Sequence, residues 1–183
     1  MKILLTRHGE TAWNKLNKVQ GKVDIPLNEK GIEQANIIKE ELSGKNVDLI
    51  ICSPLLRTRQ TVEILNRELN IPVLYDERIS ERDFGEFEGK KRKDFDFLGF
   101  WSFENNLNYE RAENIKTFFT RIYDFLDEIE ENYMDKTVLI VSHGGVSIPI
   151  KCYYNGIPED DDILSLIIRN CELIEFDGLK KIK

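Results

Sequence analysis

The chain has 183 residues, of which 41% are hydrophobic and 32% charged, with a formal net charge of −7. These values predict one soluble globular domain over residues 1–183 with a sizeable core, and they argue against a disordered chain. The acidic balance argues against general nucleic-acid binding, because that needs a basic surface. No apolar run of about 18 residues is present, so no membrane partner is expected. The N-terminus turns polar too early for a signal peptide, which predicts a cytoplasmic protein.

The three cysteines, Cys52, Cys152 and Cys171, lie in apolar stretches. Their spacing fits neither a disulfide framework nor a metal site, so we expect buried reduced thiols. Nothing in the sequence indicates a cofactor or a particular oligomeric state.

The first half of the chain alternates short apolar runs with amphipathic stretches. Residues 2–6 predict a strand that is buried on both faces. Apolar positions recur at helical spacing over residues 28–42, which predicts a helix. A second strand is expected at 48–52. Ser53 and Pro54 then favour a helix start at this point, because serine caps free amides and proline suits the first helical position.

The same alternation continues along the second half. Short strands are predicted at 73–75 and 137–142, with a long amphipathic helix over 115–129 between them. A further helix is expected to follow the second of these strands. The two closing segments, 163–169 and 171–177, are interpreted as strands of a hairpin. Strands that alternate with helices predict an α/β three-layer sandwich, with a mainly parallel central sheet flanked by helices.

The only two histidines, His8 and His143, each follow a predicted strand and precede a glycine. Ligands of parallel α/β sheets bind beyond the carboxyl ends of the strands, so both imidazoles are expected at one edge. Arg7 precedes His8, and Arg57 lies off the apolar stripe in the first turn of the helix after residue 52. Two arginines, two histidines and a helix N-terminus form a cradle for an oxyanion, most naturally phosphate. A shared metal site is disfavoured, because no third histidine or cysteine cluster is available.

Four motifs occur in order along the chain: LLTRHGETAWN, SPLLRTRQT, ISERDFGEFEG and IVSHGG. They resemble the signatures of the histidine phosphatase superfamily, in its phosphoglycerate-mutase-like branch. The resemblance runs from the first residues to beyond residue 145 and implies a phosphoglycerate-mutase-like fold. The segment AENIKTFFTR at 112–121 also resembles the family's Gly-Glu-Ser segment and the arginine eight residues after its glutamate, with Ala112 and Asn114 as departures.

The resemblance implies a role for each matching residue. His8 would be the nucleophile and become transiently phosphorylated, and Glu81 would be the proton donor. The phosphoryl oxygens would be held by Arg7, Arg57 and His143. Substrate-binding positions are implied at Asn14, Gln20, Gly21 and Gly144, and also at Arg82, because an arginine follows the catalytic glutamate in mutases.

These observations predict a metal-independent phosphomonoesterase that acts on a small-molecule phosphate ester through a phosphohistidine. The chemistry is physically reasonable, because a free imidazole titrates near pH ~6.5 and transfer to nitrogen divides one displacement into two. One alternative is phosphoglycerate mutase-type phosphoryl transfer, but mutases carry a longer insertion than the 22 residues between Gly89 and Ala112. A non-catalytic phospholigand-binding protein is the other, although it would be expected to lack His8 or Glu81.

Residues 90–111 are interpreted as a short helical and aromatic cap insertion. Two interpretations of its rings remain open: they bury against the sheet, or at least one faces the phosphate pocket and contacts an apolar leaving group. The basic run at 90–93 is likewise either solvated or attractive to an anionic substrate. The substrate itself, whether a sugar phosphate, a nucleotide or α-ribazole phosphate, is not indicated. The aromatic residues of the cap are Phe95, Phe97, Phe100, Trp101, Phe103 and Tyr109.

Overall fold

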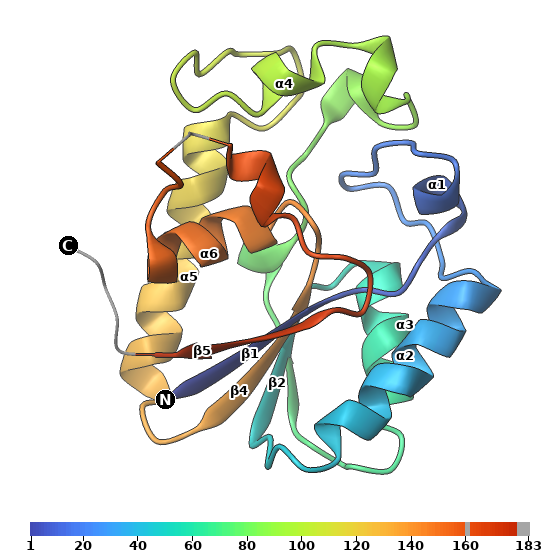
Figure 1. Ribbon diagram of the computed structural model, residues 1–183, viewed down its shortest axis with the longest axis vertical. Coiled ribbons are helices and arrows are strands. Elements are labelled where there is room, and N and C mark those ends of the chain that lie inside the picture. Colours follow the sequence, from blue (N-terminus) through green and yellow to red (C-terminus); the bar gives the residue numbers. More distant parts are fainter. Residues whose placement is uncertain (160–161, 179–183) are drawn as a thin grey trace.

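The computed structural model describes residues 1–159 and 162–178. In this part of the chain, a five-stranded sheet with the order β3-β2-β4-β1-β5 forms the centre of the molecule (Figure 1). Four strands are parallel, and only β5 runs antiparallel to its neighbour β1. The predicted mainly parallel sheet is therefore confirmed. The strands are β1 (Lys2–Arg7), β2 (Leu49–Cys52), β3 (Val73–Tyr75), β4 (Thr137–Ser142) and β5 (Leu173–Asp177).

Helices cover both faces of the sheet and complete the predicted three layers (Figure 1). Leu4, Ile50 and Leu139 join one buried cluster with two helices. Ile3 and Ile140 are the sequence neighbours of Leu4 and Leu139 and point to the opposite face of the sheet. They join a larger cluster with two other helices. Strands buried on both faces explain why their sequences are continuous apolar runs. The first pair of helices is α2 (Glu29–Leu42) and α3 (Leu56–Leu65), and the second is α5 (Ile115–Asn132) and α6 (Ser147–Asn155).

Ser53 does not cap the following helix as the sequence predicts. Helix α3 begins at Leu56, and its N-cap residue, Leu55, makes no side-chain capping bond. The Ser53 hydroxyl instead lies 2.8 Å from Nε2 of His143. The hydroxyl oxygen also accepts from the amide of Leu55 at 3.5 Å, so its shorter contact is the one with His143 at the ends of the strands.

The predicted strand at 163–169 is wrong, and so is the hairpin. Residues Ile163–Leu166 form a 3₁₀ helix, and only β5 joins the sheet. Side chains satisfy the backbone here in place of a strand partner. The Ser147 hydroxyl donates to the carbonyl of Leu166 and accepts from the amide of Ile168. A β-rich composition therefore does not by itself produce a strand.

The cap lies above the carboxyl ends of the strands, at the top of Figure 1, and contains the short helix α4 (Phe97–Phe100). It folds around aromatic pairs. Phe100 stacks on Phe84 with ring centroids 4.7 Å apart, and Phe95 stacks on Phe87 at 4.5 Å. The loop after α1 (Ala12–Lys15) pairs with the cap through an isolated β-bridge between Lys18 and Lys91. The cap is thus tied to the loop that follows β1.

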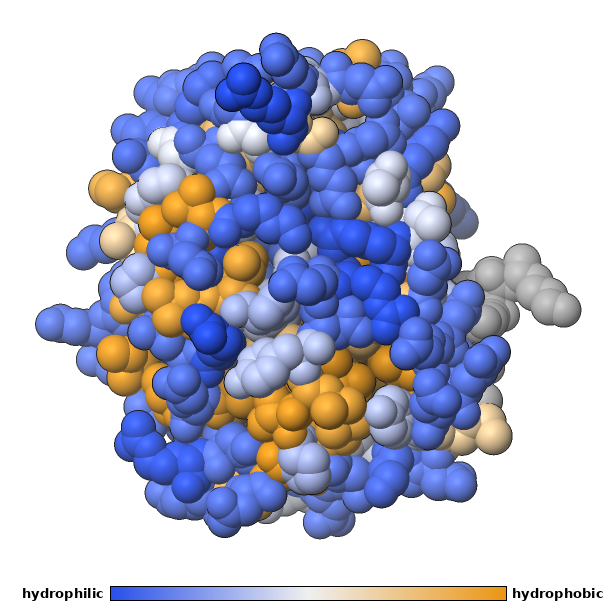
Figure 2. All heavy atoms as spheres, turned by 180° about the vertical axis from the view of Figure 1, so that it is seen from behind, coloured by the Kyte–Doolittle hydropathy of each residue, from blue (hydrophilic) through white to orange (hydrophobic). Residues whose placement is uncertain are grey.

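The surface on the other side of the molecule is mixed in character. Figure 2 shows apolar side chains gathered in its middle and lower parts, below a largely hydrophilic upper part. Exposed apolar residues include Leu74 and Tyr75 of the edge strand β3. Among the described residues, no helix has the length and apolarity needed to cross a membrane.

We expect Asn28→Ala to lower the free energy of unfolding by about 1 kcal/mol. Asn28 is the N-cap of α2: its Oδ1 accepts from the amide of Gly31 at 2.8 Å, and its Nδ2 donates to Glu10. Urea denaturation measures the change. Asn36→Ala on the exposed side of the same helix is the matched control and should not destabilise the protein. Equal effects of both substitutions would contradict the capping role.

Candidate active site

The two histidines lie side by side at the carboxyl ends of adjacent strands. Strands β1 and β4 pair in a register that places Arg7 beside Ser142, so the residues that follow are also neighbours. The amide of His8 donates to the carbonyl of Ser142 at 3.0 Å. The imidazole centroids of His8 and His143 are 5.3 Å apart. The proximity expected from the sequence is therefore present.

His8 is held in one tautomer with its second nitrogen available. Nδ1 lies 2.7 Å from the carbonyl oxygen of Gly9, and because a carbonyl only accepts, Nδ1 carries the proton. Nε2 consequently keeps a lone pair. Burial and the nearby charges of Arg57 and Arg7 hold the pKa of His8 well below its usual range, so the ring is neutral. A neutral imidazole with a free Nε2 is a competent nucleophile.

His143 is fully buried and contacts Ser53 through Nε2. Its Nδ1 is also buried and has no partner in the described part of the chain. Burial, followed by the charges of Arg57, lowers the pKa of His143 well below the usual histidine range. This imidazole is therefore neutral until an anion compensates the surrounding positive charge.

Arg57 lies in the first turn of α3 and is completely buried, and its charge acts on both histidines. Its Nη2 donates to the carbonyl of Gly21 at 2.9 Å, and its Nη1 donates to the carbonyl of Val23 at 3.0 Å. Burial lowers the pKa of Arg57 to about 10, so the guanidinium remains charged at neutral pH. Gly21, predicted to bind substrate, therefore lies behind Arg57 and orients it. A Cβ at Gly21 would overlap the Glu88 carboxylate.

Arg7 supplies a second cation to the same site. Its Nη1 donates to the carbonyl of Ile168 at 3.1 Å, while its buried Nε has no partner among the described residues. Burial lowers the pKa of Arg7 from its ordinary value. The guanidinium packs against Gly144, where an added Cβ would lie 3.0 Å from Cζ of Arg7. The glycine after His143 therefore allows the cation to approach.

Two amide side chains line the pocket with their nitrogens available to donate. The Oδ1 of Asn14 accepts from the backbone amide of Thr11 at 3.1 Å, which leaves Nδ2 free to donate elsewhere. The Oε1 of Gln20 similarly accepts from the hydroxyl of Thr11 at 3.0 Å. Both residues lie in the pocket, as the sequence predicts.

Glu81 faces His8 across this pocket and is only 7% exposed. Its Oε2 accepts from the amide of Gly145 at 3.0 Å, and its Oε1 accepts from the amide of Arg82 at 2.9 Å. A Cβ at Gly145 would overlap the carboxylate, so the second glycine after His143 leaves room for this group. Two backbone donors thus fix the carboxyl group beside the nucleophile.

The other acids of the same motif are directed elsewhere. Asp83 accepts from the amide of Gly85, and Glu88 accepts from the amides of Lys22 and Val23. The exposed Glu86 lies 4.0 Å from Lys90. Glu81 is the motif's acid that reaches the pocket of His8.

The pocket is small, with a cavity of about 50 Å³, and the cap forms part of its wall. Of the six cap aromatics, Phe97 and Trp101 line it, whereas Phe100 is 1% exposed and belongs to the core. Some of the cap rings thus belong to the core, and two of them face the pocket, whereas contact with a leaving group stays a prediction. Lys18 and Arg92 also line the wall, so the outer pocket is cationic as well as aromatic. One residue of the basic run therefore faces the ligand side.

Arg82 does not lie on the substrate side, which corrects the sequence-based expectation. It is fully buried, and its Nη1 donates to the carbonyl of Phe100 at 2.6 Å while its Nε donates to the carbonyl of Glu113 at 2.9 Å. Its guanidinium carbon lies 3.7 Å from the ring centroid of Phe100. Burial lowers the pKa of Arg82 to about 10. The side chain joins the cap to the segment that carries Glu81.

Two supporting residues are missing from the sequence-based prediction of the site. The Thr61 hydroxyl accepts from the amide of Gly9 at 3.1 Å, and Nδ2 of Asn170 donates to the carbonyl of His8 at 2.8 Å. Thr61 ends the motif SPLLRTRQT but has no predicted role there, and Asn170 lies outside the four motifs. Among residues 1–159 and 162–178, no group of three or more His, Cys, Asp or Glu side chains is placed to hold a metal ion.

Comparison with a protein-family model gives a match over residues 3–180, to the histidine phosphatase superfamily (branch 1). Among curated proteins, the uncharacterized phosphatase PhoE of Bacillus subtilis is 37% identical over 142 residues, which cover 78% of this chain and 71% of that protein. A probable phosphoglycerate mutase GpmB of Yersinia pestis is 30% identical, over 97% of this chain and 85% of that protein.

The fold has solved counterparts. The crystal structure of a putative alpha-ribazole-5'-P phosphatase from Escherichia coli superposes with a TM-score of 0.84 and 26% identity, covering 96% of this chain and 89% of that one. The phosphoglycerate-mutase-like fold expected from the motifs is thereby confirmed.

Both histidines should titrate well below pH ~6.5 in the protein without phosphate, because burial and the two guanidinium groups disfavour their charged forms. The folded protein then binds fewer protons than the unfolded chain just below pH ~6.5, so its stability should fall as the pH drops through this window. NMR titration of the imidazole signals gives the midpoints. Since the chain has only two histidines, His143→Gln assigns both signals. Midpoints at or above ~6.5 would contradict the electrostatic description.

Proposed function

Because the chain belongs to the histidine phosphatase superfamily, we propose that it hydrolyses a small-molecule phosphomonoester through a phosphohistidine on His8. One observation carries this proposal: the free Nε2 of a neutral His8 faces a pocket shared with the charged Arg7 and the carboxyl group of Glu81. Nucleophile, cation and proton donor thus line one small pocket. Phosphoryl transfer needs mainly such positioning and charge stabilisation.

In the first step, Nε2 of His8 attacks phosphorus and the bond from phosphorus to the ester oxygen breaks. The carboxylic acid of Glu81 gives its proton to the departing oxygen, so an alcohol leaves. The guanidinium groups of Arg7 and Arg57 and the imidazole of His143 stabilise the negative charge on the phosphoryl oxygens. Asn14 and Gln20 add amide donors to the pocket.

In the second step, water attacks the phosphohistidine. The Glu81 carboxylate takes a proton from the water as its oxygen bonds to phosphorus, and the bond between phosphorus and Nε2 breaks. Inorganic phosphate leaves, His8 returns to its neutral form, and Glu81 is again protonated. The cycle therefore balances without a metal ion or cofactor.

The position of Arg82 favours hydrolysis over mutase-type transfer to a second substrate. Its guanidinium is committed to the carbonyls of Phe100 and Glu113, so it is not available to bind a sugar acid. The cap is also short, as noted from the sequence. A non-catalytic phospholigand-binding protein would not need a carboxyl group beside His8, and Glu81 occupies that position.

The proposal covers the whole chain as a single histidine phosphatase domain, with residues 90–111 as its cap. Residues 160–161 and 179–183 lie outside the described part of the chain. The proposal also includes a cytoplasmic location and no nucleic-acid or membrane partner. The leaving group would contact Phe97, Trp101 and the cations of the outer pocket. A small ester such as α-ribazole phosphate can be tested as a substrate of this kind.

Brief incubation with a phosphomonoester, followed by rapid denaturation, should trap phosphate on His8 as an acid-labile, base-stable adduct. Phosphate bonded to an imidazole nitrogen has this stability pattern, whereas a phosphoserine does not. Radiolabelled phosphate and peptide mapping locate the adduct. His8→Ala is the control and should carry no label. A label that survives acid, or one that His8→Ala retains, would contradict the covalent mechanism.

Glu81→Gln should lower kcat/KM for alkyl phosphates by about 100-fold or more, and for p-nitrophenyl phosphate by far less. An alkoxide needs a proton in order to leave, whereas p-nitrophenolate does not. Glu86→Gln is the matched control, because Glu86 belongs to the same motif but is exposed. Equal losses on both ester types would show that Glu81 is not the proton donor.

A further inference from the structure

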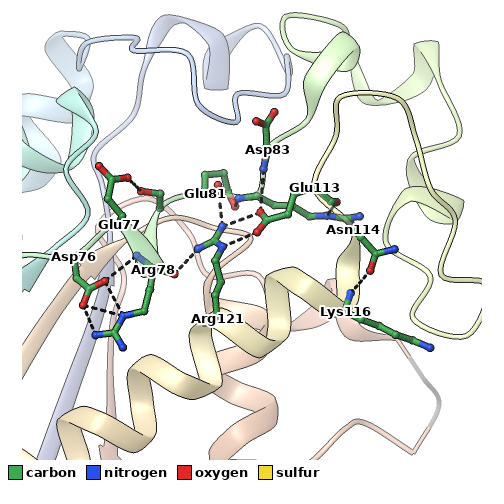
Figure 3. A network of polar contacts seen from close by, with 11 residues as sticks. Asp76, Glu77, Arg78, Glu81, Asp83, Glu113, Asn114, Lys116 and Arg121 are labelled. Atoms are coloured by element: carbon green, nitrogen blue, oxygen red, sulfur yellow. Dashed lines mark hydrogen bonds and ion pairs between the residues drawn. The ribbon is translucent and has the colours of Figure 1, made fainter.

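A polar network beneath the pocket connects helix α5 to the segment that carries Glu81. Figure 3 shows Arg121 rising from α5 between Glu81 and Glu113. Its Nε lies 2.6 Å from Oε1 of Glu113, and its Nη2 lies 2.9 Å from Oε2, so the ion pair is bidentate. The two side chains are only 18% and 15% exposed. A paired guanidinium in this setting has a fixed orientation.

The remaining donors of Arg121 bind the backbone on the N-terminal side of the Glu81 segment. Its Nη1 donates to the carbonyl of Arg78, and its Nη2 donates to the carbonyl of Glu81 at 3.3 Å (Figure 3). Residues 80–84 belong to no helix or strand, so regular secondary structure does not satisfy the carbonyl of Glu81. One side chain therefore fixes the peptide of the acid itself.

Glu113 binds the same segment on its C-terminal side. Its amide donates to the carbonyl of Asp83 at 3.0 Å, and its Oε2 accepts from the amide of Asp83 at 3.4 Å. Its own carbonyl accepts from Nε of Arg82. Arg121 and Glu113 thus hold the three residues 81–83 from both ends.

Neither residue lines the pocket, so neither is placed to touch a substrate. We propose that Arg121, oriented by Glu113, is a positioning residue that sets the carboxyl group of Glu81 for proton transfer. The inference rests on the proposed function, in which Glu81 is the proton donor. Small displacements of a catalytic group have large kinetic costs, of order 10²-fold for about 1 Å.

The test is Arg121→Lys, which keeps the charge but cannot bind both carboxylate oxygens and both carbonyls at once. We expect kcat/KM for alkyl phosphates to fall by about 10- to 100-fold. The kcat/KM for p-nitrophenyl phosphate should change by no more than about threefold. This ratio reports only the steps up to formation of the phosphohistidine, and p-nitrophenolate leaves without a proton from the acid. Glu113→Gln should show the same selectivity and serves as a second variant if Arg121→Lys does not fold.

Arg78→Lys is the matched control. Arg78 lies in the same network, but its side chain binds Asp76 and Glu128 and not the segment 81–83. This substitution should leave the ratio of alkyl to p-nitrophenyl activity unchanged, even if it lowers Tm. A similar ratio change in Arg78→Lys, or equal losses on both ester types in Arg121→Lys, would overturn the proposal.

A double variant separates this inference from the proposed function. If Arg121 acts through Glu81, adding Arg121→Lys to Glu81→Gln should cost little further activity on alkyl phosphates, whereas independent effects would multiply. Multiplied losses would overturn the positioning role while the acid role of Glu81 stands. If Glu81→Gln alone lacks ester selectivity, it is the assignment of Glu81 as the acid that fails.

Discussion

Buried positive charge beside two neutral imidazoles is the constraint on which the rest of the site depends. Arg57 is completely enclosed, and a cation in such a place needs compensation. The carbonyl oxygens of Gly21 and Val23 supply part of this compensation for Arg57, and that of Ile168 does so for Arg7. The Nε atoms of both guanidiniums remain without partners among the described residues. In the proposed mechanism, a phosphoryl group would supply both the missing negative charge and the missing acceptors.

The fold creates this constraint through strand register and small residues. Pairing of β1 with β4 places Arg7, His8 and His143 at one edge of the sheet. Gly144 and Gly145 then let Arg7 and Glu81 approach where any Cβ would intrude. The cap closes the site from above through the rings of Phe97 and Trp101. Electrostatics and packing therefore converge on one small pocket.

Local sequence signals predict the parts of the molecule that local forces determine. The buried strands, the amphipathic helices and the strand-end histidines follow from periodicity and from the rule that ligands bind beyond parallel strands. The predicted substrate-side position of Arg82 is wrong, because its actual partners, the carbonyls of Phe100 and Glu113, are distant in sequence. The helix cap predicted at Ser53 is wrong for the same reason, because its partner His143 is 90 residues away in the chain. Residues 163–169 have strand-like composition, but Ser147 and Arg7 satisfy their backbone instead.

The stereochemical course at phosphorus tests the covalent mechanism most directly. An isotopically chiral phosphomonoester is hydrolysed in water labelled with a third oxygen isotope, and the configuration of the released phosphate is determined. Attack by His8 followed by attack of water comprises two in-line displacements, each of which inverts phosphorus. Net retention of configuration is therefore expected. Net inversion would mean that water attacks the ester directly, and it would contradict the role of His8 as nucleophile.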